Sequence, residues 1–325
     1  MNATPARVAA FQDLEPELED FETAVLEGLS NAPKSLPCKF FYDREGSRLF
    51  EQICDLPEYY PTRTEIALLE ARADEMAALM GPHCHVIEFG SGSSIKIRAL
   101  INALEAPAAC TSVDISRDHL IASSEDLARE YPDVEITALC ADYTQPFDVS
   151  PPASHPNARK VGFFPGSTIG NFAPDEAAEF MATAAKILSG GDFVVGIDLK
   201  KDTARLNAAY NDSRGVTAAF NLNLLTRINR ELGGNFQLRN FAHQAFYNEA
   251  PGRIEMHLRS LRAQTVMIGH SSFEFAADET IHTENSYKYG IAEFQALATQ
   301  AGFDALHKWT DPEELFSVHY LRTSN

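Results

Sequence analysis

The sequence has no uninterrupted apolar run that approaches the roughly 20 residues a membrane-spanning helix needs. Its opening stretch, MNATPARVAAFQDLEPELED, lacks the basic segment followed by an apolar segment that marks a signal or transit peptide. The five cysteines are scattered and never spaced as CxxC, a pattern more typical of reduced thiols than of a disulfide framework or a zinc site. These absences predict a cytoplasmic protein that does not associate with membranes.

Positive charge is also scarce. Lysine and arginine number 27 against 46 aspartates and glutamates, which gives a formal net charge of −19 at pH 7. The field of such a molecule repels polyphosphates, so the composition argues against a nucleic-acid partner without excluding small zwitterions. We expect a monomer that acts on a small molecule.

The sequence does contain a long alternation of strand and helix patterns. HVIEF (85–89) has the apolar character of a buried strand, an amphipathic helix follows it, and CTSVDI (110–115) completes a βαβ unit. The alternation continues to about residue 199, which predicts a parallel sheet covered by helices on both faces. The expected fold class is therefore α/β, with a Rossmann-like, doubly wound sheet.

The pattern changes after Leu199. A helical region is followed by two runs rich in strand-forming residues, and the chain closes with an apolar-periodic helix and two strands. The simplest organisation is discontinuous. It has an αβ domain formed by 62–199 and 289–325, and a second domain formed by 1–61 and 200–288.

The glycine-rich turn EFGSGSS follows the first strand of the alternation. A dinucleotide-binding turn has the form GxGxxG; Gly90 and Gly92 supply the first two glycines, but Ile95 takes the third place. Glu88 ends the strand ahead of the turn, where a carboxylate disfavours a pyrophosphate and favours a cofactor that carries an amino group and a sulfonium. The turn therefore argues against NAD and for S-adenosylmethionine.

Acidic residues also end the next two strands. Asp114 could accept hydrogen bonds from ribose hydroxyls, as in NAD enzymes, and Asp142 could accept from an adenine amino group while Tyr143 lies against the ring. Taken singly, each aspartate could instead cap the helix that follows it. In succession, Glu88, Asp114 and Asp142 match the motif order of class I S-adenosylmethionine methyltransferases.

Two histidines lie at the start of the first strand of the alternation. His83 and His85 are two residues apart and are expected on one strand face, where they could bind a metal ion. Because no third ligand is in view, ordinary polar surface is favoured, and we expect no metal.

Segments spread over nearly the whole chain resemble one family. The stretches SLPCKFFYDREGSRLFEQICDLPEYYPTRTE, EFGSGSS, GSTIGNF, AYNDSRGVTAAFN and RIEMHLRS are together similar to the histidine-specific Nα-methyltransferases of ergothioneine biosynthesis, which convert L-histidine to the trimethyl betaine hercynine. The resemblance implies a class I methyltransferase core, a discontinuous substrate-binding domain, S-adenosylmethionine as methyl donor and L-histidine as substrate.

The resemblance also implies a role for particular residues. The groups that hold the amino and carboxylate groups of the amino acid are Tyr59, Asn171 and Tyr210. The rest of the implied pocket is Tyr42 beside the reacting amine, Phe50, Gly166 and Met256 around the substrate, and Glu284 with Ser286 as the pair that recognises the imidazole. The implied cofactor residues are Gly90, Lys96, Asp114, Asp142 and Tyr143, the last in place of the family's usual phenylalanine.

Some of these roles also make sense from the residue types. Residues two apart in a strand project to one face, so Glu284 and Ser286 can reach the same ring, although Glu284 could equally lie on a solvated hairpin. The attacking amine must be neutral, which makes Tyr42 the candidate base. Asn171 follows a strand end, where parallel sheets bind ligands, or else caps the next helix.

Three other functions stay open. A methyltransferase of another aromatic amino acid or amine would share the fold, although Glu284 disfavours rings without a basic nitrogen. An NAD-dependent oxidoreductase is disfavoured by Ile95 and Glu88. A catalytically silent module would bind S-adenosylmethionine and form no product.

Overall fold

The computed structural model describes residues 8–16, 20–92 and 95–324. The chain divides into two compact units. Unit 1 contains the described residues up to 16 together with 63–199 and 289–324, and unit 2 contains 20–62 and 200–288. The helix α3 (Tyr60–Ala71) begins in unit 2 and ends in unit 1.

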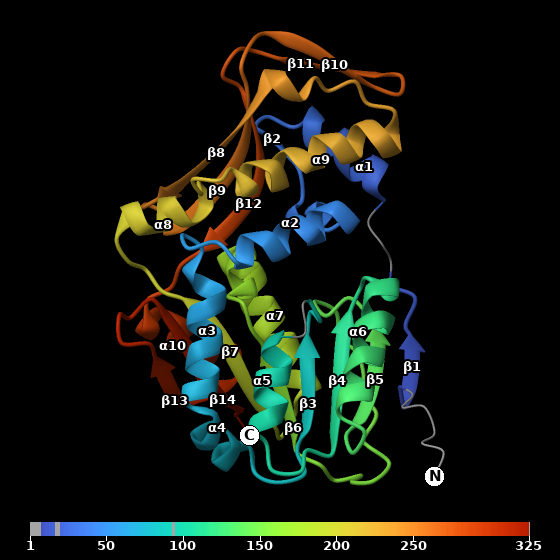
Figure 1. Cartoon of the computed structure of the whole chain (residues 1–325), viewed down its shortest axis with the longest axis vertical. Helices are drawn as coiled ribbons and strands as arrows, with labels where there is room; N and C mark the ends of the chain where they lie inside the picture. The colour runs from blue at the N-terminus through green and yellow to red at the C-terminus, as the bar shows by residue number, and fades with distance from the viewer. Residues whose placement is uncertain (1–7, 17–19, 93–94, 325) are drawn as a thin grey trace. The chain divides into compact units, whose positions relative to one another are not determined.

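Unit 1 is built on an eight-stranded sheet of order β1-β5-β4-β3-β6-β7-β14-β13 (Figure 1). Its strands are β1 (Ala10–Asp13), β3 (His85–Phe89), β4 (Ala109–Asp114), β5 (Glu135–Cys140), β6 (Lys160–Phe164), β7 (Asp192–Asp198), β13 (Phe303–Thr310) and β14 (Phe316–Thr323). Neighbours from β1 to β7 pair in parallel, whereas β14 is antiparallel to β7 and β13. The predicted α/β sheet is confirmed, and the closing strands add its antiparallel edge.

Helices cover both faces of this sheet. They are α4 (Ala73–Met80), α5 (Ile95–Ala103), α6 (Arg117–Glu130), α7 (Pro174–Ile187) and α10 (Ile291–Gln300). On one face, Ile97 of α5 packs in a core cluster with Val86 of β3. On the other face, the ring of Phe180 of α7 lies 6.0 Å from that of Phe89 at the end of β3. Because consecutive strand residues face opposite sides, both must be apolar, which explains the unbroken apolar pattern of the strands.

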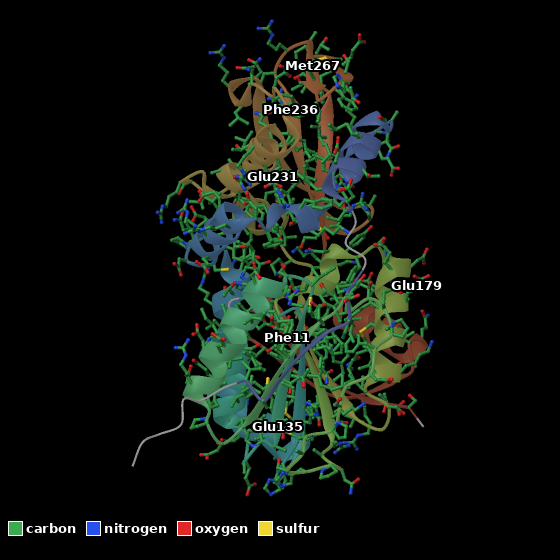
Figure 2. The ribbon with its side chains drawn as sticks, turned by 90° about the vertical axis from the view of Figure 1, so that its right-hand side faces the viewer. Phe11, Glu135, Glu179, Glu231, Phe236 and Met267 are labelled. Carbon is green, nitrogen blue, oxygen red and sulfur yellow. The ribbon has the colours of Figure 1, made fainter. Side chains whose placement is uncertain are left out.

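The N-terminal segment departs from the prediction. Residues 10–13 form β1, which pairs in parallel with residues 137–140 of β5; Figure 2 labels Phe11 and Glu135 on these two strands. The prediction placed residues 1–61 wholly in the second domain, but the described residues 8–16 belong to unit 1. Four residues are too few to show strand periodicity, and the backbone groups at the edge of β5 decide the pairing.

The two histidines near β3 do not share a strand face, contrary to the prediction. His85 begins β3, and its buried Nε2 lies 2.8 Å from Oγ1 of Thr111. Burial lowers the pKa of His85 to about 4. His83 lies outside the strand at a φ of 56°, and its exposed ring stacks on that of His155 at 4.4 Å. The left-handed backbone at His83 breaks the alternation on which the expectation depended.

Unit 2 contains a four-stranded sheet of order β2-β12-β9-β8 and a separate hairpin of β10 and β11. These strands are β2 (Lys34–Ser35), β8 (Phe241–Asn248), β9 (Arg253–Ser260), β10 (Gln264–Ile268), β11 (Ser271–Phe275) and β12 (Thr280–Tyr287). The pairing of β9 with β12 shifts register between His282 and Glu284. After this bulge, Glu284 lies opposite Met256 and Ser286 lies opposite Ile254, so the pair shares one face of β12.

The described α-helices that lie wholly within unit 2 are α1 (Phe21–Ser30), α2 (Arg44–Cys54), α8 (Thr203–Tyr210) and α9 (Val216–Leu232). Both α8 and α9 pack against β8, and α2 packs against α9. The five cysteines are free, as expected. Among the described residues, no helix has the length and apolar character needed to cross a membrane.

Candidate active site

Three acidic residues follow one another along an edge of the unit 1 sheet. β3, β4 and β5 are adjacent and parallel, so their carboxyl ends meet at the same edge. Glu88 is the next-to-last residue of β3, Asp114 ends β4, and Asp142 follows the end of β5. The sheet order therefore brings together acids that lie 26 and 28 residues apart in the sequence.

Glu88 is a buried carboxyl group with few hydrogen bonds to offset its loss of hydration. Its side chain accepts only a long hydrogen bond, 3.5 Å, from Oγ of Ser112 among the described residues. Burial and, to a lesser extent, the charge of the neighbouring Asp114 raise the pKa of Glu88 to about 8. A cation at this strand end would favour the ionised form. The site therefore suits a ligand with a positively charged group, and no pyrophosphate.

Neither aspartate caps a helix with its side chain. Asp114 accepts from the backbone N–H of Ser116 at 2.7 Å, and burial raises its pKa. Asp142 accepts from the backbone N–H and the hydroxyl of Thr144 at 2.9 and 2.7 Å. Each aspartate thereby forms a tight turn that holds its carboxylate at the carboxyl ends of the strands. The remaining lone pairs of the carboxylate can accept hydrogen bonds from a ligand.

The glycine turn and Tyr143 lie together. Gly90 has a φ of 81°, and a Cβ there would lie 3.6 Å from the Tyr143 ring. The ring in turn lies 5.8 Å from each of Phe164 and Phe180. A Cβ added at Gly92 would meet no described atom within 4 Å, and Ser93 and Ser94 lie outside the described residues. The turn therefore leaves room beside an aromatic ring that the core holds in place.

Lys96, expected at the cofactor, forms an ion pair that the sequence did not reveal. Its Nζ lies 2.6 Å from Oε2 of Glu65, a fully buried residue of α3. The same carboxylate accepts from the backbone N–H of Gly166 at 2.9 to 3.0 Å. Glu65 thereby ties α3 and α5 to the loop after β6. Glu65 ends the stretch EYYPTRTE, which matches the family, but nothing in the sequence indicated that its partner is Lys96.

Gly166 and Asn171 lie in the segment after β6, in unit 1. Gly166 has a φ of 83° and Ser167 a φ of 57°, and Oγ of Ser167 accepts from the backbone N–H of Asp198 in β7. Asn171 ends a short 3₁₀ helix, whereas α7 is capped at Ala173, whose N–H donates to Glu176. Asn171 is therefore no helix cap, and no described residue forms a hydrogen bond with its side chain.

The remaining predicted substrate residues belong to unit 2, where four of them form an aromatic cluster. Successive ring centroids lie 5.6 Å apart for Tyr42 and Phe50, 6.4 Å for Phe50 and Tyr59, and 6.1 Å for Tyr59 and Tyr210. Phe220 of α9, which the sequence reading missed, lies 5.8 Å from Tyr42 and 6.1 Å from Phe50. The aromatic faces of such a cluster attract cationic amines.

The position of Tyr42 is set by the residues that follow it. Asp43 caps α2 by accepting from the N–H of Gly46, and it also accepts from the amide of Asn223 in α9. A Cβ at Gly46 would lie 1.7 Å from the carbonyl oxygen of Phe41, so the position requires glycine. The cap and the glycine fix the turn that carries Tyr42 beside α9.

Glu284, Ser286 and Met256 share one face of the unit 2 sheet. Burial raises the pKa of Glu284 to about 7, against the opposing charge of Lys288. Within the described residues, no group donates a hydrogen bond to the Glu284 carboxylate. Ser286 accepts from Tyr210 at 2.9 Å and from Lys288 at 2.8 Å. A half-buried carboxylate that lacks a donor is suited to a ligand N–H.

Tyr59 lies close to this face. Burial raises the pKa of Tyr59 well above its ordinary value, and Tyr210 and Glu284 are among the groups that raise it further. Tyr59 therefore stays a neutral phenol, able to donate a hydrogen bond to a carboxylate or accept one from an amine.

The strand order of unit 1 and its three strand-end acids define an α/β S-adenosylmethionine-dependent methyltransferase. The sequence profile of the family described as "Histidine-specific methyltransferase, SAM-dependent" matches residues 21–323. The chain belongs to this family.

Characterised relatives cover most of the chain. It is 44% identical over 300 residues to the histidine N-alpha-methyltransferase of Mycolicibacterium smegmatis, and the matched region covers 90% of this chain and 92% of that protein. It is 41% identical over 293 residues to the enzyme of the same name from Mycobacterium tuberculosis, with 88% and 90% covered. Ergothioneine biosynthesis protein 1 of Neurospora crassa is 30% identical over 304 residues, or 90% of this chain and 34% of that protein.

Proposed function

We propose that this protein transfers methyl groups from S-adenosylmethionine to the α-nitrogen of L-histidine until the trimethyl betaine hercynine is formed, a step of ergothioneine biosynthesis. Family membership and the names of the relatives support the reaction. The observation that carries the choice of substrate is Glu284, a carboxylate without a described hydrogen-bond donor, next to Ser286 on one strand face. A carboxylate and a hydroxyl match the two nitrogens of an imidazole.

The residues of unit 1 fit the methyl donor. Glu88 would face its ammonium group, Asp114 its ribose hydroxyls and Asp142 its adenine amino group, with Tyr143 against the adenine ring. Glu88 supports this fit most directly, because a buried carboxyl group whose pKa is raised by burial gains most from a cationic neighbour. When bound, S-adenosylmethionine supplies a methyl group on an already activated sulfonium.

The residues of unit 2 would hold the acceptor. Tyr59 and Tyr210 would bind its amino and carboxylate groups, Phe50, Phe220 and Met256 would line the pocket, and Glu284 with Ser286 would hold the ring. Three transfers convert one ammonium into a trimethylammonium and release three protons. Aromatic faces tolerate a growing, methylated cation because the attraction does not require N–H groups.

The remaining groups would act on the amine. An amine that enters as ammonium must lose a proton before it attacks, and Tyr42, whose side chain is 42% exposed, could pass that proton to water. Asn171 and Gly166, in unit 1, are proposed to orient the amino acid. Orientation supplies most of the catalysis, because an in-line arrangement of nitrogen, methyl carbon and sulfur removes much of the entropic barrier.

One experiment tests the proposal. The purified protein is incubated with S-adenosylmethionine and each of the common amino acids in turn, and the products are examined by mass spectrometry for one, two and three added methyl groups. We expect products from histidine, with the trimethylated form accumulating. A product from another amino acid and none from histidine would overturn the choice of substrate, and no product from any amine would leave only a cofactor-binding protein.

A further inference from the structure

Lys288 is a buried cation of unit 2 that lies beside Ser286. It is 2% exposed, and lysine is almost never so buried unless it is paired. Its backbone N–H donates to the carbonyl of Gly252 at 2.9 Å, which fixes the chain just after β12. Lys288 follows Glu284 and Ser286 at the same two-residue spacing in the stretch ENSYK. The resemblance to the methyltransferase family implies no role for Lys288.

The ammonium of Lys288 contacts both hydroxyl groups at this position. Its Nζ donates to Oγ of Ser286 at 2.8 Å and to the hydroxyl oxygen of Tyr210 at 3.1 Å. The hydroxyl of Tyr210 donates to Oγ of Ser286 at 2.9 Å. An ammonium can only donate, and a phenol is a better donor than an aliphatic hydroxyl because it is more acidic. The three groups therefore form a triangle in which Ser286 receives two hydrogen bonds.

This arrangement determines what Ser286 can offer to a ligand. A hydroxyl oxygen has two lone pairs and one hydrogen. Both lone pairs of Ser286 are occupied, by Tyr210 and by Lys288; the ammonium cannot accept its hydrogen, and the Tyr210 hydroxyl, which accepts from Lys288, directs its own hydrogen at Ser286. The hydrogen of Ser286 must therefore be directed to a third group.

The charge of Lys288 also acts on Glu284. It favours the ionised carboxylate against the effect of burial. An ionised carboxylate only accepts hydrogen bonds. The pocket thus presents one acceptor, at Glu284, and one donor, at Ser286, on the same strand face.

We propose that Lys288 is a positioning residue that fixes Ser286 as a donor, so that the pocket selects a ring with one N–H for Glu284 and one bare nitrogen for Ser286. A neutral imidazole meets this requirement in a single tautomer. An indole or a pyrrole has no bare nitrogen, and an imidazolium has none either. The inference rests on the proposed function, because it takes the acceptor's ring to lie against Glu284 and Ser286.

The test compares histidine with an analogue of similar shape. In 3-(2-pyrrolyl)alanine the ring keeps an N–H and lacks the bare nitrogen. For the unchanged protein, we expect kcat/KM with S-adenosylmethionine to be roughly 10- to 100-fold lower for the pyrrole than for histidine, because the donor of Ser286 is left without a partner.

The informative variant is Lys288→Met, which keeps the length of the side chain and removes its charge. Without the ammonium, Ser286 can donate to Tyr210 and present a lone pair instead, so the preference for histidine over the pyrrole should fall to within about threefold. Ser286→Ala should lose the same preference while Lys288 is retained. Lys34→Met is the matched control: Lys34 lies in β2 of the same sheet, paired with Glu279, and its loss should leave the preference intact.

The outcomes separate this inference from the proposed function. If the unchanged protein does not methylate histidine, the proposed function fails. If it does, but folded Lys288→Met and Ser286→Ala both keep the full preference for histidine over the pyrrole, the role of Lys288 is overturned and the function stands. If circular dichroism shows that Lys288→Met does not fold, Ser286→Ala alone decides whether Ser286 donates to the bare nitrogen of the ring. A loss of the preference in Lys34→Met as well would also overturn the role of Lys288.

Discussion

The ammonium of Lys96 and the carboxylate of Glu65 lie 2.6 Å apart in unit 1, and Glu65 is fully buried there. The pair joins α3 to α5, and through the N–H of Gly166 it also holds the loop after β6. Two residues 31 positions apart thereby fix a segment that begins 70 residues after the second of them.

Glu65→Gln should therefore destabilise the protein strongly. Loss of one partner of a buried ion pair leaves the other charge uncompensated, and we expect the free energy of unfolding to fall by about 3 kcal/mol. The measurement is equilibrium denaturation in urea. Glu130→Gln removes the more exposed partner of Arg98 and should cost less than about 1 kcal/mol. Adding Lys96→Met to Glu65→Gln should restore part of the loss, and equal effects of Glu65→Gln and Glu130→Gln would contradict the assigned role of the pair.

Binding of S-adenosylmethionine should release a proton near pH 7. The pKa of Glu88 is raised to about 8, so the carboxyl group is mostly protonated before binding. A cationic ligand beside it lowers that pKa, and the proton leaves. Calorimetric titrations in buffers of different ionisation enthalpy measure the release directly. It should disappear in Glu88→Gln and above about pH 9, and proton uptake would contradict the placement of the cation.

Glu284→Gln should weaken histidine binding. Loss of the charged acceptor for the ring N–H should raise KM for histidine roughly 10- to 100-fold. Steady-state kinetics measure the change, and the KM for S-adenosylmethionine serves as the internal control, because the residues proposed to bind it belong to unit 1. Equal rises in both KM values would mean that Glu284 acts on the fold and not on the ring.

Relative to the unchanged protein, Glu284→Gln should become more stable as the pH rises. The pKa of Glu284 is raised from 4.5 to about 7 in the folded protein. The folded state therefore binds a proton that the unfolded state releases, and the resulting stability is fully present below about pH 4.5 and lost as the pH rises to about 7. Glu284→Gln does not undergo this loss. Relative to the unchanged protein, its free energy of unfolding should be about 3 kcal/mol higher at about pH 8 than at about pH 4, and a pH-independent difference in denaturation experiments would contradict this.

Gly196→Ala should disrupt the surroundings of Glu65. A Cβ at Gly196 in β7 would lie 1.9 Å from Oε1 of Glu65 and 3.1 Å from the ring of Phe316. Overpacking of this kind costs about 1 to 3 kcal/mol, to be measured by thermal and urea unfolding. Gly290→Ala is the control, because its Cβ would make only an ordinary contact at 3.7 Å with Glu293. If both variants unfold alike, the tight approach at Gly196 is not limiting.

Much of the fold could be predicted because strand and helix patterns are local. The alternation from residue 85 to 199, the closing helix α10 and the strands β13 and β14 all lie where the pattern indicates. Short or irregular elements could not be predicted in the same way. β1 has four residues and takes its place only from the edge of β5, and the left-handed His83 removes that residue from the face it was expected to share with His85.

The candidate site shows the same division. Glu88, Asp114 and Asp142 could be identified because each ends a strand, and a parallel sheet gathers such ends at one edge. Glu65, Phe220 and Lys288 could not. Each acts through a partner distant in sequence, namely Lys96, Tyr42 and Tyr210, and single-sequence periodicity contains no information about such contacts.

The sequence by itself determined the class of sheet, the choice of methyl donor and the family, because these depend on residue types at local spacings and on long matching segments. Only the tertiary structure decided the charge balance of the pockets. Burial raises the pKa of Glu88 and Glu284, and a buried lysine occupies a lone pair of Ser286. Desolvation and hydrogen-bond direction depend on which groups surround an atom in space, and that is settled when β9 pairs with β12 and α8 packs against β8.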